Sequence, residues 1–266
     1  MKVSQRPEWD GVDAYLYDQF SPGLPGDVEF YLEEVVKAGS PVLELGFGTG
    51  RILIPVAQAG IDIVGLDRAQ HMLELVSAKV AGLSQATQNR IELAPGDMRS
   101  FALNRQFNLV MIPYRALTHL LTPEDQMQAL QLAWEHLVDG GKLVINNSDP
   151  LLETAVRELA HPEPPLQKMA DLIRPDNGNR VVVWNSISYD TQTQVHSEDR
   201  VFEEIDGEGL VLSRKHTPLV YRDTYRYEMQ CLLRLCGFEI EALYGDFQRG
   251  PFRYGGEQVW VARRKG

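Results

Sequence analysis

Short apolar runs alternate with amphipathic segments over the first half of the chain. The apolar runs predict strands at residues 41–45, 61–66, 90–93, 107–112 and 142–146. Spacing typical of helices covers residues 49–58, 69–81 and 123–138. Strands and helices that alternate in this way predict a parallel sheet with helices on both faces. Two final apolar runs, 238–243 and 258–262, predict a hairpin that extends this sheet.

The pattern changes after Asn147. Residues 148–180 are mixed, and three runs with strand character then follow at 181–189, 195–205 and 210–221. Their short, turn-rich connections are typical of antiparallel hairpins. We therefore expect an α/β core, residues 1–147 and 224–266, that carries a small antiparallel β insertion over residues 148–223. We expect this insertion to shape a substrate pocket.

Charge and composition narrow the class of partner. The chain of 266 residues has 26 basic and 37 acidic side chains, a net charge of −11. Such a field repels phosphate backbones and anionic lipids, which disfavours nucleic acid and membrane partners. No apolar run reaches the roughly 18 residues of a spanning helix, and the polar start of the chain is unlike a signal peptide. We expect a cytoplasmic monomer or homodimer, with no metal because the histidines and cysteines lack ligand spacing.

A glycine turn carries the strongest chemical signal. Gly46, Gly48 and Gly50 follow a predicted strand and open a predicted helix. Glycines at such a turn let the backbone approach a ligand that a Cβ would exclude. Asp67 follows the next strand about 20 residues later, where its carboxylate can accept hydrogen bonds from both hydroxyls of a ribose. These features predict that an adenosine-type cofactor binds at the carboxyl ends of the strands.

The residues around this turn bear on the identity of the cofactor. The spacing G-x-G-x-G differs from the dinucleotide fingerprint, and Arg51 occupies the place of that fingerprint's last glycine. Glu44, two residues before the glycines, would repel a pyrophosphate and attract the ammonium of a methionine moiety. Asp97, after the third strand, can accept a hydrogen bond from the exocyclic amine of adenine. The acids therefore favour adenosine joined to methionine over a dinucleotide.

As a set, the segments Glu44–Gly50, Gly65–Asp67 with Met72 downstream, and Gly96–Met98 resemble class I S-adenosylmethionine-dependent methyltransferases. The resemblance covers residues 12–147 and the C-terminal hairpin. It implies a doubly wound, mostly parallel sheet of seven strands whose last strand is antiparallel. It also implies S-adenosylmethionine as the cofactor and S-adenosylhomocysteine as the product.

The resemblance also implies roles for single residues. Asp67 would grip the ribose, Met72 would pack near the adenine, and Asp97 with Met98 would read the base. We place Arg68 and Pro113 among the cofactor contacts as well.

The N-terminal segment is the last part of the resemblance. Residues 1–40 look like the helical cover of the cofactor in small-molecule members, with Tyr17 as a contact. Packing of Tyr17 in an apolar core is an equal alternative.

The segment after the fourth strand is where chemistry on an acceptor is expected. Met111–Arg115 lacks the polar residue and the second proline of the motif that amino-methyltransferases of bases and glutamine carry there. His119 is a candidate general base, with a packing histidine as the alternative. Tyr114 can take part in catalysis or line the pocket, and Arg115 can bind an acidic substrate group or brace the loop. Trp184 of the insertion is a further candidate for substrate contact.

The sequence therefore predicts methyl transfer from S-adenosylmethionine to a nitrogen or oxygen of a small molecule, in enzyme class EC 2.1.1.-. Methyl transfer from a sulfonium is an in-line displacement, in which the enzyme chiefly positions the two reactants. The alternatives are an NAD(P)-dependent oxidoreductase and a binding protein without turnover. A nucleic-acid methyltransferase is opposed by the acidic charge and by the departure after the fourth strand.

Overall fold

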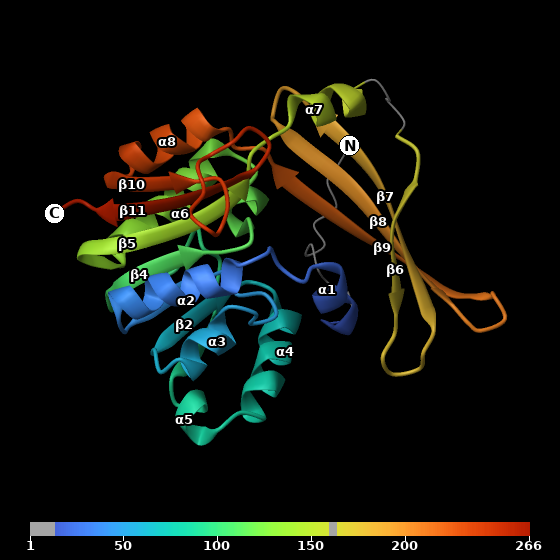
Figure 1. Cartoon of the computed structure of the whole chain (residues 1–266), viewed down its shortest axis with the longest axis horizontal. Coiled ribbons are helices and arrows are strands. Elements are labelled where there is room, and N and C mark those ends of the chain that lie inside the picture. Colours follow the sequence, from blue (N-terminus) through green and yellow to red (C-terminus); the bar gives the residue numbers. More distant parts are fainter. Residues whose placement is uncertain (1–13, 160–163) are drawn as a thin grey trace. The chain divides into compact units, whose positions relative to one another are not determined.

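Among residues 14–159 and 164–266, which the computed structural model describes, seven strands form the larger of two sheets (Figure 1). Their order is β10-β11-β5-β4-β1-β2-β3. The bounds are β1 Val42–Leu45, β2 Ile63–Asp67, β3 Ile91–Pro95, β4 Phe107–Ile112, β5 Leu137–Ser148, β10 Phe238–Tyr244 and β11 Glu257–Arg264. Neighbours from β3 to β5 pair in parallel, whereas β11 is antiparallel to β5 and β10. The predicted sheet, with its antiparallel last strand, is confirmed.

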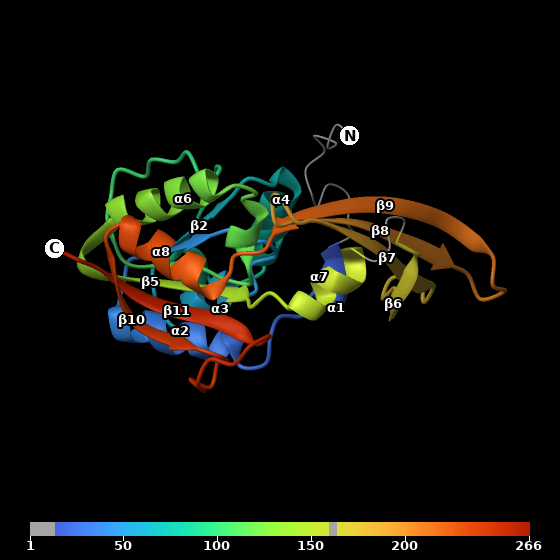
Figure 2. The ribbon, with the colours of Figure 1, turned by 90° about the horizontal axis from the view of Figure 1, so that it is seen from above.

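Helices cover both faces of this sheet. They are α2 Asp27–Ala38, α3 Leu53–Gln58, α4 Gln70–Ala81, α5 Gln85–Gln88, the 3-10 turn η1 Ala116–His119, α6 Pro123–Glu135 and α8 Arg226–Leu235. Figure 2 shows α6 and α8 on one face and α2 and α3 on the other. Leu43 and Leu45 of β1 belong to the apolar cluster that includes Leu130 of α6 and Leu233 of α8. Because successive side chains of a strand point to opposite faces, Glu44 lies on the other side, that of α2.

Two predicted helices have different bounds in the structure. The first begins at Leu53 instead of Thr49, because Gly48 and Gly50 have φ values of 55° and 78°, outside the right-handed helix. The second ends at Glu135 instead of Val138, since Leu137 already pairs with Phe107 as the start of β5.

The smaller unit carries the second sheet. Its strands are β6 Gln167–Ile173, β7 Arg180–Asp190, β8 Val195–Ile205 and β9 Val211–Arg222, all antiparallel to their neighbours in that order. The predicted antiparallel insertion is thus confirmed. The segment read as mixed contributes strand β6 and helix α7, Leu152–Leu159.

The structure assigns the N-terminal segment to both units. The smaller unit comprises Leu151–Arg222 and the described residues up to Pro22, and the larger unit comprises Gly23–Pro150 and Asp223–Gly266. Helix α1, Ala14–Phe20, contributes Leu16 to an apolar cluster with Phe202 of β8. The expected cover of residues 1–40 is therefore divided between α1 in one unit and α2 in the other, and its residues 1–13 lie outside the described part of the chain.

Candidate active site

The glycine turn lies at the carboxyl ends of β1 and β2. The Gly46 N–H donates to the Leu66 carbonyl at 2.7 Å, which fixes the end of β1 beside β2. Gly46 has a φ of 78°, and a Cβ there would lie 3.0 Å from the Cβ of Ala116. At Gly48, with a φ of 55°, a Cβ would meet nothing within 4 Å. The chain after β1 therefore has a backbone conformation suited to glycine, and Gly48 faces open space.

Asp67 closes this turn from the neighbouring strand. Its Oδ2 accepts a hydrogen bond from the Gly48 N–H at 2.9 Å, and its Oδ1 accepts one from the Ala69 N–H at 2.9 Å. The side chain is buried. A carboxylate oxygen has two acceptor positions, so each oxygen of Asp67 retains one position for a further donor.

Glu44 is the buried acid of β1. Its residue is 2% exposed, and its Oε2 has no hydrogen-bond partner among the described residues. Burial raises the pKa of the Glu44 carboxyl well above its ordinary value, while the nearby Arg51 guanidinium lowers it and the Asp67 carboxylate raises it. The unpaired Oε2 can accept a hydrogen bond from a ligand, and a cationic donor would favour the ionised form of Glu44.

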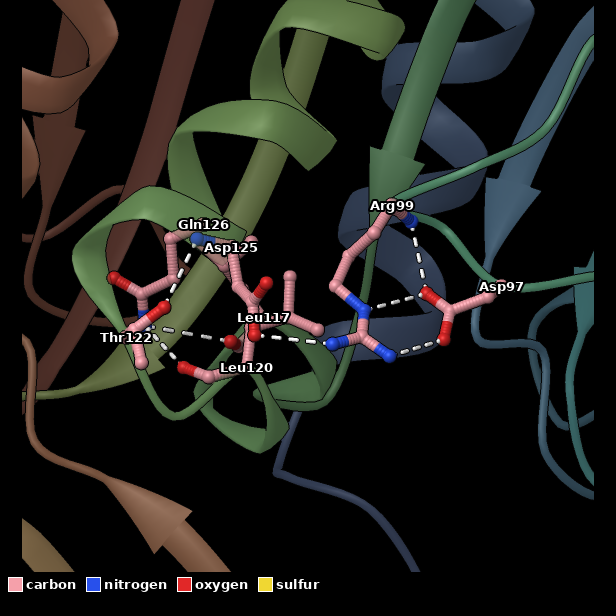
Figure 3. Close-up of polar contacts among 7 residues, drawn as sticks. All are labelled: Asp97, Arg99, Leu117, Leu120, Thr122, Asp125 and Gln126. Carbon is pink, nitrogen blue, oxygen red and sulfur yellow. Dashed lines mark hydrogen bonds and ion pairs between the residues drawn. The ribbon is translucent and has the colours of Figure 1, made fainter.

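Asp97 follows β3 and is gripped by Arg99 (Figure 3). The Arg99 Nε donates to Asp97 Oδ1 at 3.0 Å, Nη2 donates to Oδ2 at 2.7 Å, and the Arg99 main-chain N–H donates to Oδ1 at 2.9 Å. The side-chain hydrogen bonds from Arg99 lower the pKa of the Asp97 carboxyl. Arg99 also donates through Nη1 to Asp125 of α6 at 3.0 Å. Asp97 is thus an ionised, oriented carboxylate.

The other predicted cofactor contacts in the larger unit lie on or next to these strand ends. Met72 of α4 is buried, and Met98 is half-buried against the core cluster. Pro113 is buried directly after β4, whereas Arg68 is exposed after β2.

The turn after β4 has an unusual backbone. Tyr114 and Arg115 have φ values of 51° and 63°, in the left-handed region that side chains other than glycine rarely adopt. Such strain persists where surrounding contacts over-determine it, as at functional sites. The Arg51 guanidinium lies over the Tyr114 ring, 5.0 Å from its centroid, and donates to Asp27 at 2.8 Å. Arg51 therefore joins the glycine turn to this strained turn and to α2.

Asn146 of β5 stabilises the same turn through hydrogen bonds of its side chain. This fully buried amide accepts hydrogen bonds at Oδ1 from the Tyr114 N–H at 2.8 Å and from the Tyr31 hydroxyl at 3.0 Å. Its Nδ2 donates to Glu257 Oε2 at 2.9 Å, and Glu257 Oε1 accepts from Arg115 Nη2. Of the two predicted roles of Arg115, the contact to Glu257 corresponds to bracing of the loop.

Three predicted residues remain, His119 in the larger unit and Tyr17 and Trp184 in the smaller one. His119 ends η1 and is half-buried. Tyr17 packs against the apolar cluster of the smaller unit, which is the alternative expected for it. Trp184 also belongs to that unit, on β7, and its indole N–H donates to Glu203 at 2.7 Å.

Sequence reasoning missed Arg99, Asn146 and Glu257 as members of the site. A polar residue near the end of a buried strand was the available signal for Asn146, and Arg99 lies two residues from a predicted site acid. Over the described ranges, no group of three or more His, Cys, Asp or Glu side chains is placed to hold a metal ion. No helix of the described residues has the length and apolar character needed to cross a membrane.

Comparisons with known proteins agree with this geometry. The methyltransferase domain family matches residues 42–141. The structure of the CcbJ methyltransferase from Streptomyces caelestis superimposes with a TM-score of 0.77 at 24% identity, over 95% of this chain and 96% of that one. Residues 42–141 thus match a methyltransferase domain family, and the fold is that of a solved methyltransferase.

Two curated relatives extend the comparison. The putative methyltransferase YqeM of Bacillus subtilis is 23% identical over 245 residues, 88% of each chain. A dTDP-3-amino-3,4,6-trideoxy-alpha-D-glucopyranose N,N-dimethyltransferase of Streptomyces venezuelae is 32% identical over 139 residues, 50% of this chain. The alignment spans 55% of that enzyme's length, as it does for two further curated relatives.

Proposed function

We propose that this protein transfers a methyl group from S-adenosylmethionine to a nitrogen or oxygen of a small-molecule acceptor. The observation that carries the proposal is the set of open acceptor positions on Glu44, Asp67 and Asp97, which follow one another at the ends of β1, β2 and β3. Adenosyl methionine offers donors of the same kinds, namely an ammonium, two ribose hydroxyls and an exocyclic amine.

Asp67 fits a ribose in number as well as in type. Each of its oxygens already accepts one main-chain N–H and keeps one position. Two adjacent hydroxyls would fill these two positions, one on each oxygen. The bond to Gly48 also keeps the glycine turn beside the carboxylate, so that the backbone and the acid face the ligand together.

Glu44 supports methionine over a pyrophosphate. Its buried Oε2 lacks a partner, so a ligand that brings an ammonium supplies the missing donor and compensates for burial of the charge. A pyrophosphate at this turn would place its negative charges close to the Asp67 carboxylate and would bring Glu44 no cationic donor. The NAD(P)-dependent oxidoreductase is therefore the weaker candidate.

When bound, the cofactor would supply an electrophilic methyl group on a sulfonium, and the protein would position the acceptor relative to it. The strained Tyr114–Arg115 turn, held by Asn146, Glu257 and Arg51, is a rigid element on which an acceptor can rest. His119 remains the candidate base for an oxygen acceptor. An amine acceptor needs only to reach the site deprotonated, without a dedicated base.

A nitrogen acceptor has support from one relative. The Streptomyces venezuelae protein that shares 32% identity with half of this chain is named as an N,N-dimethyltransferase of an amino sugar. We therefore place small amines first among acceptors for screening, with hydroxyl compounds second. A protein that binds the cofactor without turnover is the remaining alternative, and turnover with any acceptor would eliminate it.

Calorimetric titration of the purified chain with S-adenosylmethionine, S-adenosylhomocysteine and NAD tests the proposal. We expect binding of the first two ligands with micromolar affinity and no binding of NAD. Binding of NAD alone would refute the assignment of the cofactor and would support the oxidoreductase instead.

A further inference from the structure

Arg99 makes more hydrogen bonds at the cofactor end of the sheet than any role assigned so far requires. Its guanidinium lies between two acids, Asp97 on one side and Asp125 on the other (Figure 3). Asp125 is itself anchored, because its main-chain N–H donates to the Thr122 hydroxyl that caps α6, at 3.1 Å. The guanidinium is therefore held by an acid on each side. Its two donors to Asp97, Nε and Nη2, form a planar fork that is fixed in place.

The hydrogen bonds from Arg99 leave one acceptor position of the Asp97 carboxylate open. A carboxylate has about four acceptor positions. The main-chain N–H and Nε of Arg99 fill both positions of Oδ1, and Nη2 fills one position of Oδ2. One acceptor position remains, on Oδ2. Asp97 can thus receive one strong donor from a ligand without any rearrangement of its side chain.

We propose that Arg99 is a positioning residue that makes Asp97 selective for a base with an exocyclic amine. This inference rests on the proposed function, because the base is the adenine of the cofactor. An amine donates one hydrogen to the open position on Oδ2. A 6-oxo base would place a carbonyl oxygen against the same carboxylate oxygen, which cannot rotate away while Arg99 holds it. By fixing the Asp97 carboxylate, the fork therefore favours the base with an exocyclic amine and disfavours the 6-oxo base.

A purely structural role for Arg99 is the competing explanation. On that view the Asp97–Arg99–Asp125 chain only ties the segment after β3 to the start of α6, and ligand selectivity is independent of it. The two explanations differ in one measurable quantity, the ratio of affinities for S-adenosylhomocysteine and its 6-oxo analogue S-inosylhomocysteine. Thermal stability would fall in both cases and does not discriminate between them.

The experiment measures both dissociation constants by calorimetry for the wild type, Arg99→Met and Arg99→Lys. We expect the wild type to bind S-adenosylhomocysteine at least about tenfold more tightly than the analogue. In Arg99→Met, Asp97 keeps only the main-chain bond and regains freedom to rotate, so the ratio should fall about three- to tenfold. Arg99→Lys should not restore it, because an ammonium cannot form the fork.

Arg105→Met is the matched control. Arg105 forms an ion pair with Glu92, and its side chain is 39% exposed, close to the 35% of Arg99. The ratio should stay at the wild-type value in this variant. An unchanged or increased ratio in Arg99→Met and Arg99→Lys, or a wild type that does not discriminate between the two ligands, would overturn the inference. Failure of the wild type to bind S-adenosylhomocysteine at all would instead refute the proposed function.

Discussion

Replacement of Asp67 by alanine is the most direct test of the proposed cofactor site. The carboxylate has one open position on each oxygen. In the proposed function, the substitution therefore removes two hydrogen bonds between a charged acceptor and the ribose. Hydrogen bonds to charged groups contribute about 1.5–3 kcal/mol each. The lower end of this range, about 3 kcal/mol for the pair, corresponds to a loss of affinity of roughly 150-fold.

The same substitution should also lower the stability of the fold. Gly48 and Ala69 would lose the acceptor of their main-chain N–H groups. Both residues are partly buried, so each loss should cost no more than the roughly 1–3 kcal/mol of an unpaired buried donor. Asp67→Asn should not rescue binding, because its amide NH2 would face one of these N–H groups. Asp62→Ala serves as a control, since Asp62 is an exposed acid that pairs with Arg90 at 2.7 Å.

Calorimetric titration with S-adenosylhomocysteine and a thermal melt of each variant would measure the two effects. The control should match the wild type in affinity. If Asp67→Ala keeps its fold and binds the ligand as tightly as the wild type does, the assignment of Asp67 to the ribose is wrong.

Four further changes probe the rest of the site. Burial raises the pKa of Glu44, so the stability of the wild-type fold should decrease as the pH rises from the pKa of the unfolded state through that of the folded state. Cofactor affinity should increase over the same interval. Glu44→Gln should flatten both pH profiles, which thermal melts and calorimetric titrations across pH would measure. Gly65→Ala should lower the melting temperature, because the new methyl would lie 2.3 Å from Leu53 Cδ1. Asn146→Ala should destabilise the fold by about 1–3 kcal/mol in denaturant titrations, since it leaves buried donors unpaired. His119→Ala should reduce turnover on a hydroxyl acceptor while cofactor binding stays intact; full activity would leave His119 as a packing residue.

The strand-end acids could be predicted because their positions depend on local sequence. Each follows a short apolar run, and parallel strands bring their carboxyl ends to one edge of the sheet. Glu44 and Asp67 need only the register between β1 and β2, in which Glu44 pairs with Gly65. Spacing along the chain was therefore sufficient to place them at a common site.

The turn after β4 could not be predicted in the same way. The residue types of Tyr114 and Arg115 do not indicate a positive φ, because this backbone conformation is imposed by partners that are distant in sequence. Asn146 is 32 residues from Tyr114, and Glu257 is 142 residues from Arg115. Such contacts depend on the strand order of the finished sheet, in which β11 inserts beside β5.

Element boundaries failed for a related reason. The helix predicted over residues 123–138 was ended before Asp139–Gly141 by the usual rule that glycine ends a helix. In the structure these residues lie within β5, where the pairing with β4 shifts between Phe107 and Leu109. Pairing with a neighbouring strand had priority over the local signal.

These differences suggest a division within the site. In the proposed function, the acids at the ends of β1, β2 and β3 bind the cofactor through local motifs, and each has acceptor positions that the fold leaves open. The Tyr114–Arg115 turn is defined by α2, β5 and β11 through Tyr31, Asn146 and Glu257. Changes in those distant elements can therefore move the turn where we propose the acceptor to bind, while the strand-end acids keep their geometry. If the proposed function is correct, such a fold can change its acceptor without loss of its methyl donor. The donor can then be inferred from the residues, whereas the acceptor must be found by screening.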